Sequence, residues 1–367
     1  MNESLSRKRP RTASTSNDPV ANGNNSEPTA CEQVQAATRD KDYWFEDGTI
    51  ILVSQGFAFR VYRGMLAEHS SVFRSMLDIG QGTPTAADTV DGCPVVTLYD
   101  SPRDLRGLFR LIYPLSGNLK FSNSRIEIDF ISAVVRLDHK YELKGLYDQA
   151  MSYLTTYYTT NFNTWADGKN ASDWSPDPIH AITAINLARL TNTPSILPTA
   201  FYILCTLGPE IALGARRADG TKEQLSPGDL FQLLSMKEKL CAANMNTAYA
   251  LFRTQSSGHC SNAGGYSCCA DVIRKVLDAA GQGKGPHALA SACALDGWME
   301  NVEAYAATAP PPPPQHVNAY MMMYTQSQRA LCKGCRTYLQ SRERELRRGV
   351  WRKLPEYAGV TVANWDA

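Results

Sequence analysis

Cysteine is the residue type in this chain whose spacing best fits a defined chemistry. The chain has ten cysteines, and Cys332 and Cys335 form a C-x-x-C pair that places two thiolates on one side of a turn or helix. Tetrahedral zinc needs such a pair together with two further thiolate or imidazole ligands. Cys260, with either Cys268 or Cys269, supplies a second pair. We predict a structural zinc site formed by Cys260, Cys268, Cys332 and Cys335.

A zinc ion at this site would hold the C-terminal helix to the region around residue 265, across an intervening proline-rich segment. His259 lies nearby as a spare ligand. Two other interpretations stay open. Small cysteines often pack among alanines in helical domains without binding metal. A redox-active C-x-x-C pair is less favoured, because no strand precedes Cys332 as a thioredoxin-like site requires.

The histidines and glycine-rich segments do not form a recognisable active site. His69 and His139 fall inside expected helices, and no serine or carboxylate stands at a recognisable spacing from His180, His287 or His316. The chain contains no G-x-S-x-G, H-E-x-x-H or P-loop motif. Residues 281–285 are glycine-rich but lack a preceding strand and a following serine or threonine. We therefore predict a protein that is not an enzyme and has no cofactor other than zinc.

A basic stretch near the C-terminus raises the question of a nucleic-acid partner. From Arg329 to Lys353 there are nine lysines and arginines against two glutamates. This composition fits either a surface for nucleic acid or a helix face that is solvated and ion-paired. Trp351, Leu354 and Tyr357 favour docking of the segment onto the protein itself. The formal charge of the whole chain is only +1, so direct nucleic-acid binding is not expected.

A second basic cluster, Arg7-Lys8-Arg9-Pro10-Arg11, lies within residues 1–39, whose Ser, Thr, Asn and Pro content predicts a disordered arm. The cluster fits a nuclear localisation signal, and a solvated basic tail is the alternative. The N-terminus lacks the apolar core of a secretory signal, and no apolar run approaches the roughly 18 residues of a membrane span. We expect a nuclear or cytoplasmic protein with no membrane partner, and the cluster favours the nucleus.

Composition and periodicity predict an α+β domain followed by a mainly α-helical domain. Thr49–Ser54 and Phe57–Val61 should form a β-hairpin around Gln55-Gly56. Turn-forming residues mark a linker, and prolines 310–314 mark a spacer. The expected segments are a disordered arm (1–39), an α+β domain (40–158), a linker (159–178), a helical domain (179–306), a Pro-rich spacer (307–316), and a C-terminal helix with a docking tail (317–367).

Several helix starts are marked by residues that cap helices well. Ser70 is expected to cap a new turn within the helical residues 64–77. Ser101 and Asp104 predict a capping box at the start of the next helix, with Pro102 at its first position. A last long helix is expected from about residue 317 to 348.

The α+β segment resembles the BTB/POZ domain, an interaction module. The resemblance rests on the run F-x-V-Y-R-x-x-L-A-x-x-S-x-x-F, which spans Phe59 to Phe73, and on Asp47 ahead of it. It continues through Cys93–Val96 and Leu137–Tyr141. Tyr62 stands where the family usually has histidine. Residues 184–189, 196–202 and 350–357 resemble the helical extension in a large fungal, basidiomycete-type group of BTB proteins.

The resemblance implies a BTB/POZ domain followed by a helical domain, and a protein–protein interaction role as an adaptor with protein partners. It also implies a homodimer formed through the BTB domain. Two more specific roles stay open. Arg7–Arg11 favour a nuclear regulator of transcription or chromatin. Met76-Leu77-Asp78 corresponds loosely to the family's cullin contact, so a substrate adaptor of a cullin ubiquitin ligase is the other role.

Overall fold

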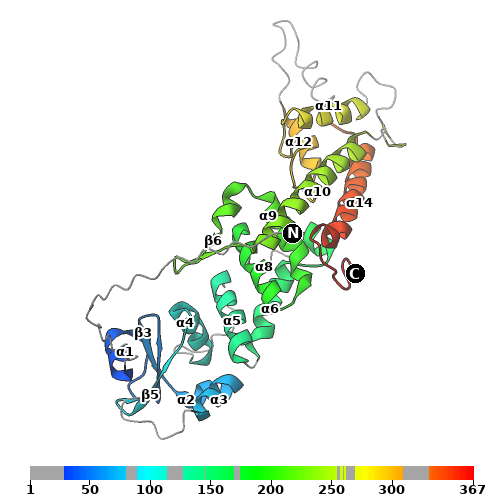
Figure 1. Ribbon diagram of the computed structural model, residues 1–367. Coiled ribbons are helices and arrows are strands. Elements are labelled where there is room, and N and C mark those ends of the chain that lie inside the picture. Colours follow the sequence, from blue (N-terminus) through cyan, green and yellow to red (C-terminus); the bar gives the residue numbers. More distant parts are fainter. Residues whose placement is uncertain are drawn as a thin grey trace, which may run out of the picture.

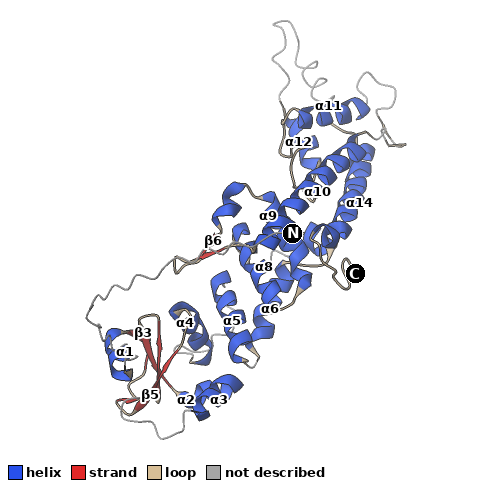
Figure 2. Ribbon diagram, in the orientation of Figure 1, coloured by secondary structure: helices blue, strands red, loops and turns tan. Residues whose placement is uncertain are grey.

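The chain forms an elongated molecule with a small sheet domain at one end and a longer helical part (Figure 1). The computed structural model describes residues 29–79, 89–113, 127–143, 145–168, 174–253, 257–258, 260–261, 269–308 and 330–367. The strands of these residues lie in the sheet domain, apart from one short hairpin in the helical part (Figure 2). None of the helices described has both the length and the apolar composition needed to cross a bilayer.

A five-stranded sheet forms the centre of the first domain. Its strands are β1 (Thr38–Trp44), β2 (Ile50–Ser54), β3 (Phe57–Val61), β4 (Thr89–Val90) and β5 (Cys93–Thr97), in the spatial order β1-β3-β2-β5-β4. β2 and β3 form the predicted antiparallel hairpin. Gln55 and Gly56 connect them with φ of 44° and 80°. Positive values at both positions are what a tight two-residue hairpin turn requires.

Helices cover both faces of the sheet because β2 is apolar on both. Ile50 and Leu52 belong to a core shared with α4 (Pro102–Ile112) and α5 (Ile128–Tyr141). Ile51 and Val53 belong to a smaller core on the other face. Successive side chains of a strand point to opposite faces, so the consecutive apolar residues of β2 are buried on both faces of the sheet.

Two short helices, α2 (Arg63–His69) and α3 (Ser71–Ile79), follow the hairpin. They meet at Ser70, which caps the second helix as predicted. Its hydroxyl accepts a hydrogen bond from the Phe73 amide at 2.9 Å and donates one to the carbonyl of Tyr141. The Phe73 and Tyr141 rings stack with centroids 4.3 Å apart. One buried serine therefore joins the α2–α3 pair to α5.

The prediction of a disordered arm is wrong for residues 29–39. Thr29 and Glu32 form a capping box, with 2.8 Å between the Thr29 amide nitrogen and a Glu32 carboxylate oxygen, and this box starts α1 (Ala30–Ala36). Val34 is buried against the sheet, and β1 follows directly. The polar composition of this segment gave no sign of the capping box or of the apolar contact of Val34. These two features are enough to order α1 because the sheet provides a surface for Val34 to pack on. Residues 1–28, with the basic cluster, lie outside the described residues.

The remaining described residues are mostly helical. Before the hairpin come α6 (Leu146–Tyr157), α7 (Phe162–Ala166), η2 (Pro178–His180), α8 (Ala181–Leu190), η3 (Pro194–Ile196), α9 (Leu197–Thr206) and η4 (Pro209–Leu213). The hairpin is β6 (Ala215–Arg216) with β7 (Lys222–Glu223), and after it come α10 (Pro227–Phe252), α11 (Cys269–Gly281), α12 (Met299–Ala307) and α14 (Lys333–Tyr357). α10 and α14 pack side by side and antiparallel, and the Gln232 side chain donates to the Tyr357 carbonyl at 2.7 Å.

Some predicted boundaries in this part are wrong. The predicted linker (159–178) is not a free connection, because Phe162 and Trp174 are buried in the main helical core. The β6–β7 hairpin was not expected. The last helix begins at Lys333 after non-helical residues 330–332, and it continues to Tyr357, since buried Trp351 extends its apolar face. From residue 309 the predicted spacer (307–316) lies outside the described residues.

One largely buried arginine links the helical part to the sheet domain. Arg217 directly follows β6, and its side chain is 10% exposed. Its Nη2 lies 2.6 Å from Asp104 of α4, and its Nε lies 3.8 Å from Asp129 of α5 and 3.7 Å from Glu223 of β7. Burial raises the pKa of Asp104, an effect that the Arg217 charge opposes. The guanidinium therefore keeps several buried carboxylates compatible with the folded state.

The predicted capping box of α4 is half right. The Ser101 hydroxyl does cap the helix, accepting a hydrogen bond from the Arg103 amide at 3.2 Å. Asp104 does not complete the box, because its carboxylate pairs with Arg217. The partner is distant in the chain, so local spacing favoured the wrong one.

Replacing Arg217 with methionine should destabilise the protein by about 3–5 kcal/mol, because it leaves buried carboxylates without their cation. Urea denaturation measures the change. Arg274→Met is the matched control: its side chain is 71% exposed and its ion pair with Asp271 lies on the surface, so the expected change is below about 0.5 kcal/mol. Equal effects of the two substitutions would contradict the role given to Arg217.

Candidate metal centre

Four cysteine thiols converge where three segments of the helical part meet. Cys260 lies in the loop after α10, Cys269 begins α11, and Cys332 and Cys335 lie at the start of α14. Their sulfur atoms all lie within 4.8 Å of one another. Tetrahedral zinc with bonds of about 2.3 Å holds its sulfur ligands roughly 3.8 Å apart. A contraction of about 1 Å or less therefore brings the four sulfurs to the geometry of a zinc site.

The start of α14 positions the C-x-x-C pair. Cys332 is the N-cap residue, and its Sγ accepts a hydrogen bond from the Cys335 amide at 3.5 Å. Helix N-caps are usually Ser, Thr, Asp or Asn, whose side-chain oxygens accept a backbone hydrogen bond. A cysteine accepts such a bond best as a thiolate. The Cys269 Sγ accepts a hydrogen bond from the Cys332 amide at 3.4 Å. The starts of α11 and α14 therefore touch through the sulfur cluster.

Local electrostatics separate the thiols. The hydrogen bond from the Cys335 backbone lowers the pKa of the Cys332 thiol to about 6. Burial raises the pKa of the Cys269 thiol to about 12 and also raises that of Cys335. Cys332 is therefore the thiol of this cluster that loses its proton most readily, and it can bind a cation first. A bound Zn²⁺ would then drive deprotonation of the other thiols, as a metal ion does for its ligands.

The donor set indicates which metal fits and what it would do. Four sulfurs select zinc or an iron–sulfur cluster over the hard cations that prefer oxygen. A closed set of four ligands with no open position is typical of a structural zinc site. The Cys260 and Cys332 sulfurs are 4.0 Å apart, about twice the length of a disulfide bond, and the described cysteines are free thiols. The cluster therefore fits a structural metal ion.

The structure brings together three of the four predicted ligands, Cys260, Cys332 and Cys335. The fourth predicted ligand, Cys268, lies outside the described residues, as does His259. Cys269, the alternative within the second pair, supplies the fourth sulfur. Whether Cys268 or Cys269 is the ligand depends on where α11 begins, and the spacing of residues in the sequence does not determine that point.

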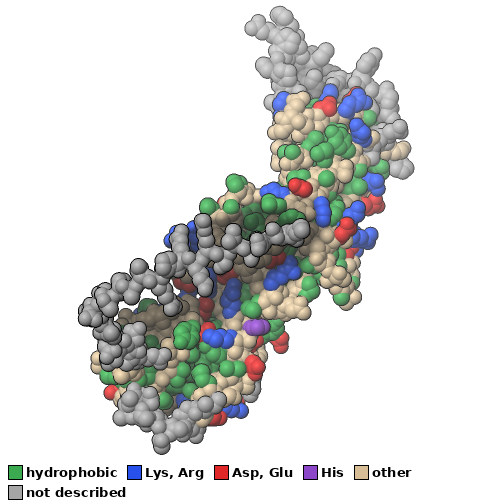
Figure 3. Space-filling view, in the orientation of Figure 1, with side chains coloured by type: hydrophobic (Ala, Val, Ile, Leu, Met, Phe, Trp, Pro, Cys, Tyr) green, Lys and Arg blue, Asp and Glu red, His purple; other side chains and the backbone are tan. Residues whose placement is uncertain are grey.

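The basic stretch near the C-terminus docks onto the protein. Arg348 and Arg352 both pair with Asp366, at 2.9 Å and 3.0 Å. Trp351 is fully buried and stacks on Trp365 with ring centroids 5.0 Å apart. On the face seen in Figure 3, basic and acidic side chains are interspersed along the helical part and do not form one basic surface. The docking interpretation is therefore the one that the packing supports.

His287 has partners that the sequence did not reveal. Its Nε2 lies 3.1 Å from Glu300 and its Nδ1 lies 3.8 Å from Asp296, while its ring meets Trp298 at a centroid distance of 6.1 Å. These partners come after His287 in the sequence and are separated from it by a loop, so they form no short motif with it. The contacts hold the loop ahead of α12 against the helix.

Comparison with known proteins adds no family assignment to these observations. No protein-family model matches the chain, and no curated protein matches it significantly. The sulfur cluster and the sheet domain are therefore the features on which a function can be proposed.

Replacing Cys332 with serine should abolish stoichiometric zinc binding, because it removes the ligand that ionises most readily. We expect about one zinc per chain in the unsubstituted protein and less than about 0.2 in the variant, measured by plasma mass spectrometry after dialysis. Cys31→Ser is the control, since Cys31 is exposed on α1 and should leave the zinc content unchanged. Full zinc occupancy in Cys332→Ser would contradict the site.

Proposed function

We propose that this protein is a non-enzymatic adaptor that binds other proteins through its sheet domain, acting as a BTB/POZ domain. The observation that carries the proposal is that the residues on which the resemblance rests are buried or hydrogen-bonded within the domain. Phe59, Leu66 and Phe73 are fully buried in one core. The Ser70 hydroxyl, the reactive-looking group among them, is engaged in joining α2 and α3 to α5. These residues therefore pack the core and hold the helices in place, which supports a binding role over catalysis.

Tyr62, which replaces the usual histidine of the family, fits the same frame. Its hydroxyl donates to the Asp47 carboxylate at 2.8 Å, and its ring stacks on Phe45 with centroids 5.0 Å apart. The replacement keeps an aromatic ring and a hydrogen bond, and it removes an imidazole that could titrate. Homodimerisation through this domain belongs to the same proposal, and light scattering in solution would test it.

The sulfur cluster has a structural role in this proposal, with zinc as its metal. Zinc held by Cys260, Cys269, Cys332 and Cys335 would join the loop after α10 to the start of α14. The opposite ends of these two helices are already joined by the hydrogen bond from Gln232 to the Tyr357 carbonyl. The metal would therefore fix the last helix at both ends and keep the helical surface in one shape for a partner.

Two specific roles compete within the adaptor class. For the cullin role, Leu77 is buried while the Asp78 side chain is 60% exposed, with its Oδ1 3.4 Å from Arg63. The acidic residue of the loose cullin motif is therefore accessible to a partner. The nuclear role rests on Arg7–Arg11, which lie outside the described residues. Affinity purification and localisation separate the two roles.

If the protein recruits a cullin, Asp78→Arg should reduce cullin recovery by at least about ten-fold, because it reverses the charge at the contact. Affinity purification from the native cell with quantitative mass spectrometry measures this. Glu68→Arg is the control, since Glu68 is also an exposed acid paired with an arginine, Arg74 at 3.7 Å. Cullin missing from the unsubstituted sample contradicts the cullin role. If no protein at all is enriched over a tag-only sample, the adaptor proposal is overturned.

If the protein is a nuclear regulator, replacing Arg7, Lys8, Arg9 and Arg11 with alanine should move a fluorescently tagged chain from the nucleus to the cytoplasm. The reason is that import receptors recognise the charge of such a cluster. Replacing Arg342 and Arg344 in the C-terminal basic stretch with alanine is the control and should leave nuclear localisation unchanged. An unsubstituted protein that stays in the cytoplasm would contradict the nuclear role.

A further inference from the structure

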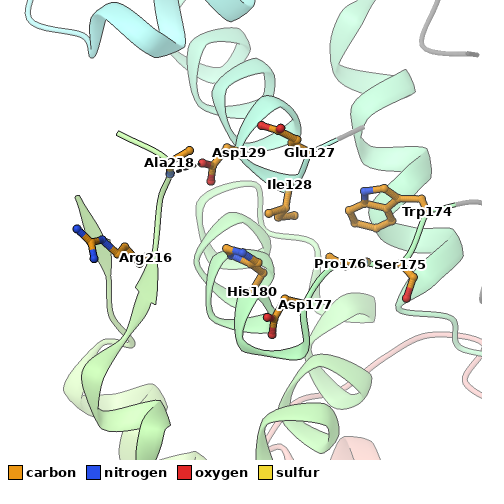
Figure 4. A pocket seen from close by; sticks show the side chains of 10 residues that line it. All are labelled: Glu127, Ile128, Asp129, Trp174, Ser175, Pro176, Asp177, His180, Arg216 and Ala218. Atoms are coloured by element: carbon orange, nitrogen blue, oxygen red, sulfur yellow. Dashed lines mark hydrogen bonds between the residues drawn. The ribbon is translucent and has the colours of Figure 1, made fainter. Parts of the chain in front are cut away.

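A pocket of about 600 Å³ opens between the sheet domain and the helical part, next to the Arg217 junction. Its walls come from the start of α5, from residues 174–180 and from the chain around the end of β6. Figure 4 shows side chains from all three segments bordering one space. The polar and aromatic residues that matter for binding are Glu127, Asp129, Trp174, Asp177, His180 and Arg216.

Asp129 supplies an unused acceptor in this pocket. Its side chain is 7% exposed, and its Oδ2 accepts a hydrogen bond from the Ala218 amide at 2.8 Å. Its Oδ1 accepts no hydrogen bond from the residues described. Arg217 Nε, which also lacks a hydrogen bond among the described residues, lies 3.8 Å from Oδ1, so the two groups form an ion pair without a hydrogen bond. Since buried carboxylate oxygens normally accept hydrogen bonds, this atom is suited to an incoming donor.

His180 and Trp174 complete the chemistry of the walls. The His180 Nδ1 is also buried without a hydrogen-bond partner among the described residues. Trp174 borders the pocket, and Tyr157 holds its ring edge-to-face at a centroid distance of 5.4 Å. Indole rings attract cations more strongly than other aromatic side chains. The pocket therefore combines a carboxylate acceptor, an imidazole nitrogen and a ring suited to a cation.

Carboxylates outnumber guanidinium groups around the pocket. Among the lining residues that the structure describes, Glu127, Asp129 and Asp177 are acidic and Arg216 is basic. Arg103 lies next to the first two, 3.1 Å from Glu127 and 3.6 Å from Asp129. When Arg103, Arg217 and Arg136 are counted with the two further carboxylates that they contact, Asp104 and Glu223, the described groups around the pocket still carry one negative charge in excess. This balance favours a cationic ligand over a phosphate or a carboxylate.

We propose that the pocket binds an arginine side chain presented by a partner protein. A guanidinium offers several donors in one plane, which suits the free Asp129 oxygen together with Glu127 or Asp177. The part of the largely buried Trp174 ring that borders the pocket adds an aromatic contact for the cation. The pocket is larger than one arginine side chain, so part of the partner backbone enters with it. The inference rests on the proposed adaptor function and names a chemical feature of the partner.

The experiment uses the full chain and two small probes, Nα-acetyl-arginine amide and its neutral counterpart, Nα-acetyl-citrulline amide. Calorimetry or ligand-observed NMR gives both affinities. The arginine probe should bind at least about ten-fold more tightly than the citrulline probe, and its affinity should fall as salt is raised. Equal affinity for the two probes would overturn the proposal, because the pocket would not be reading the charge.

A double variant locates the binding. Glu127→Gln with Asp177→Asn should weaken the arginine probe by at least about five-fold. The fold should be kept, since asparagine can still cap η2 as Asp177 does by accepting from the Ile179 amide at 3.1 Å. Glu303→Gln, at an exposed acid paired with Arg336, is the control and should bind normally. Unchanged binding in the double variant would place the probe elsewhere and overturn the proposal.

The chain's own arm carries arginines and is a competing source of the same side chain. Replacing Arg7, Lys8, Arg9 and Arg11 with glutamine separates the sources. Equal probe affinity in this variant and in the unsubstituted chain supports a partner protein, whereas binding seen only in the variant assigns the pocket to the arm and overturns the assignment. Because probes are tested on isolated protein, a failure here leaves the outcome of affinity purification unaffected.

Discussion

The convergence of four thiols is the constraint on which the C-terminal half of the fold depends. α14 must stay beside α10, because Trp351 and Leu354 are fully buried in the core that the last helix closes. The hydrogen bond between Gln232 and Tyr357 secures one end of this helix pair. At the other end, free thiols about 4 Å apart make only weak contacts with one another. A metal bound by all four would replace these contacts with coordinate bonds that hold the segments together.

Ion pairs next to the β6–β7 hairpin join the sheet domain to this helical body, in addition to the apolar contacts that α5 makes with the helical core. Arg217 reaches Asp104 and Asp129 on two helices of the sheet domain, so the two parts have a defined relation near that point. The pocket that we propose binds an arginine side chain opens beside it, where residues of both parts meet. A partner bound there would touch the sheet domain and the helical part at once, which makes the junction itself part of the binding surface.

Features set by local chemistry were predictable, and features set by distant partners were not. The β2–β3 hairpin and the Ser70 cap follow from turn residues, apolar strand patterns and capping preference. Asp104 was assigned to a cap because its real partner, Arg217, is remote in sequence. At the metal centre, the C-x-x-C pair was visible as a motif, whereas the choice of Cys269 depends on where α11 starts.

The most direct test of the central claim is X-ray absorption at the zinc edge on the purified full-length chain. If the four thiols hold zinc, we expect a single shell of four sulfur ligands at about 2.3 Å from zinc, with no nitrogen or oxygen ligand. A shell containing nitrogen or oxygen, or a protein that carries no zinc when purified under reducing conditions with zinc supplied, would contradict it.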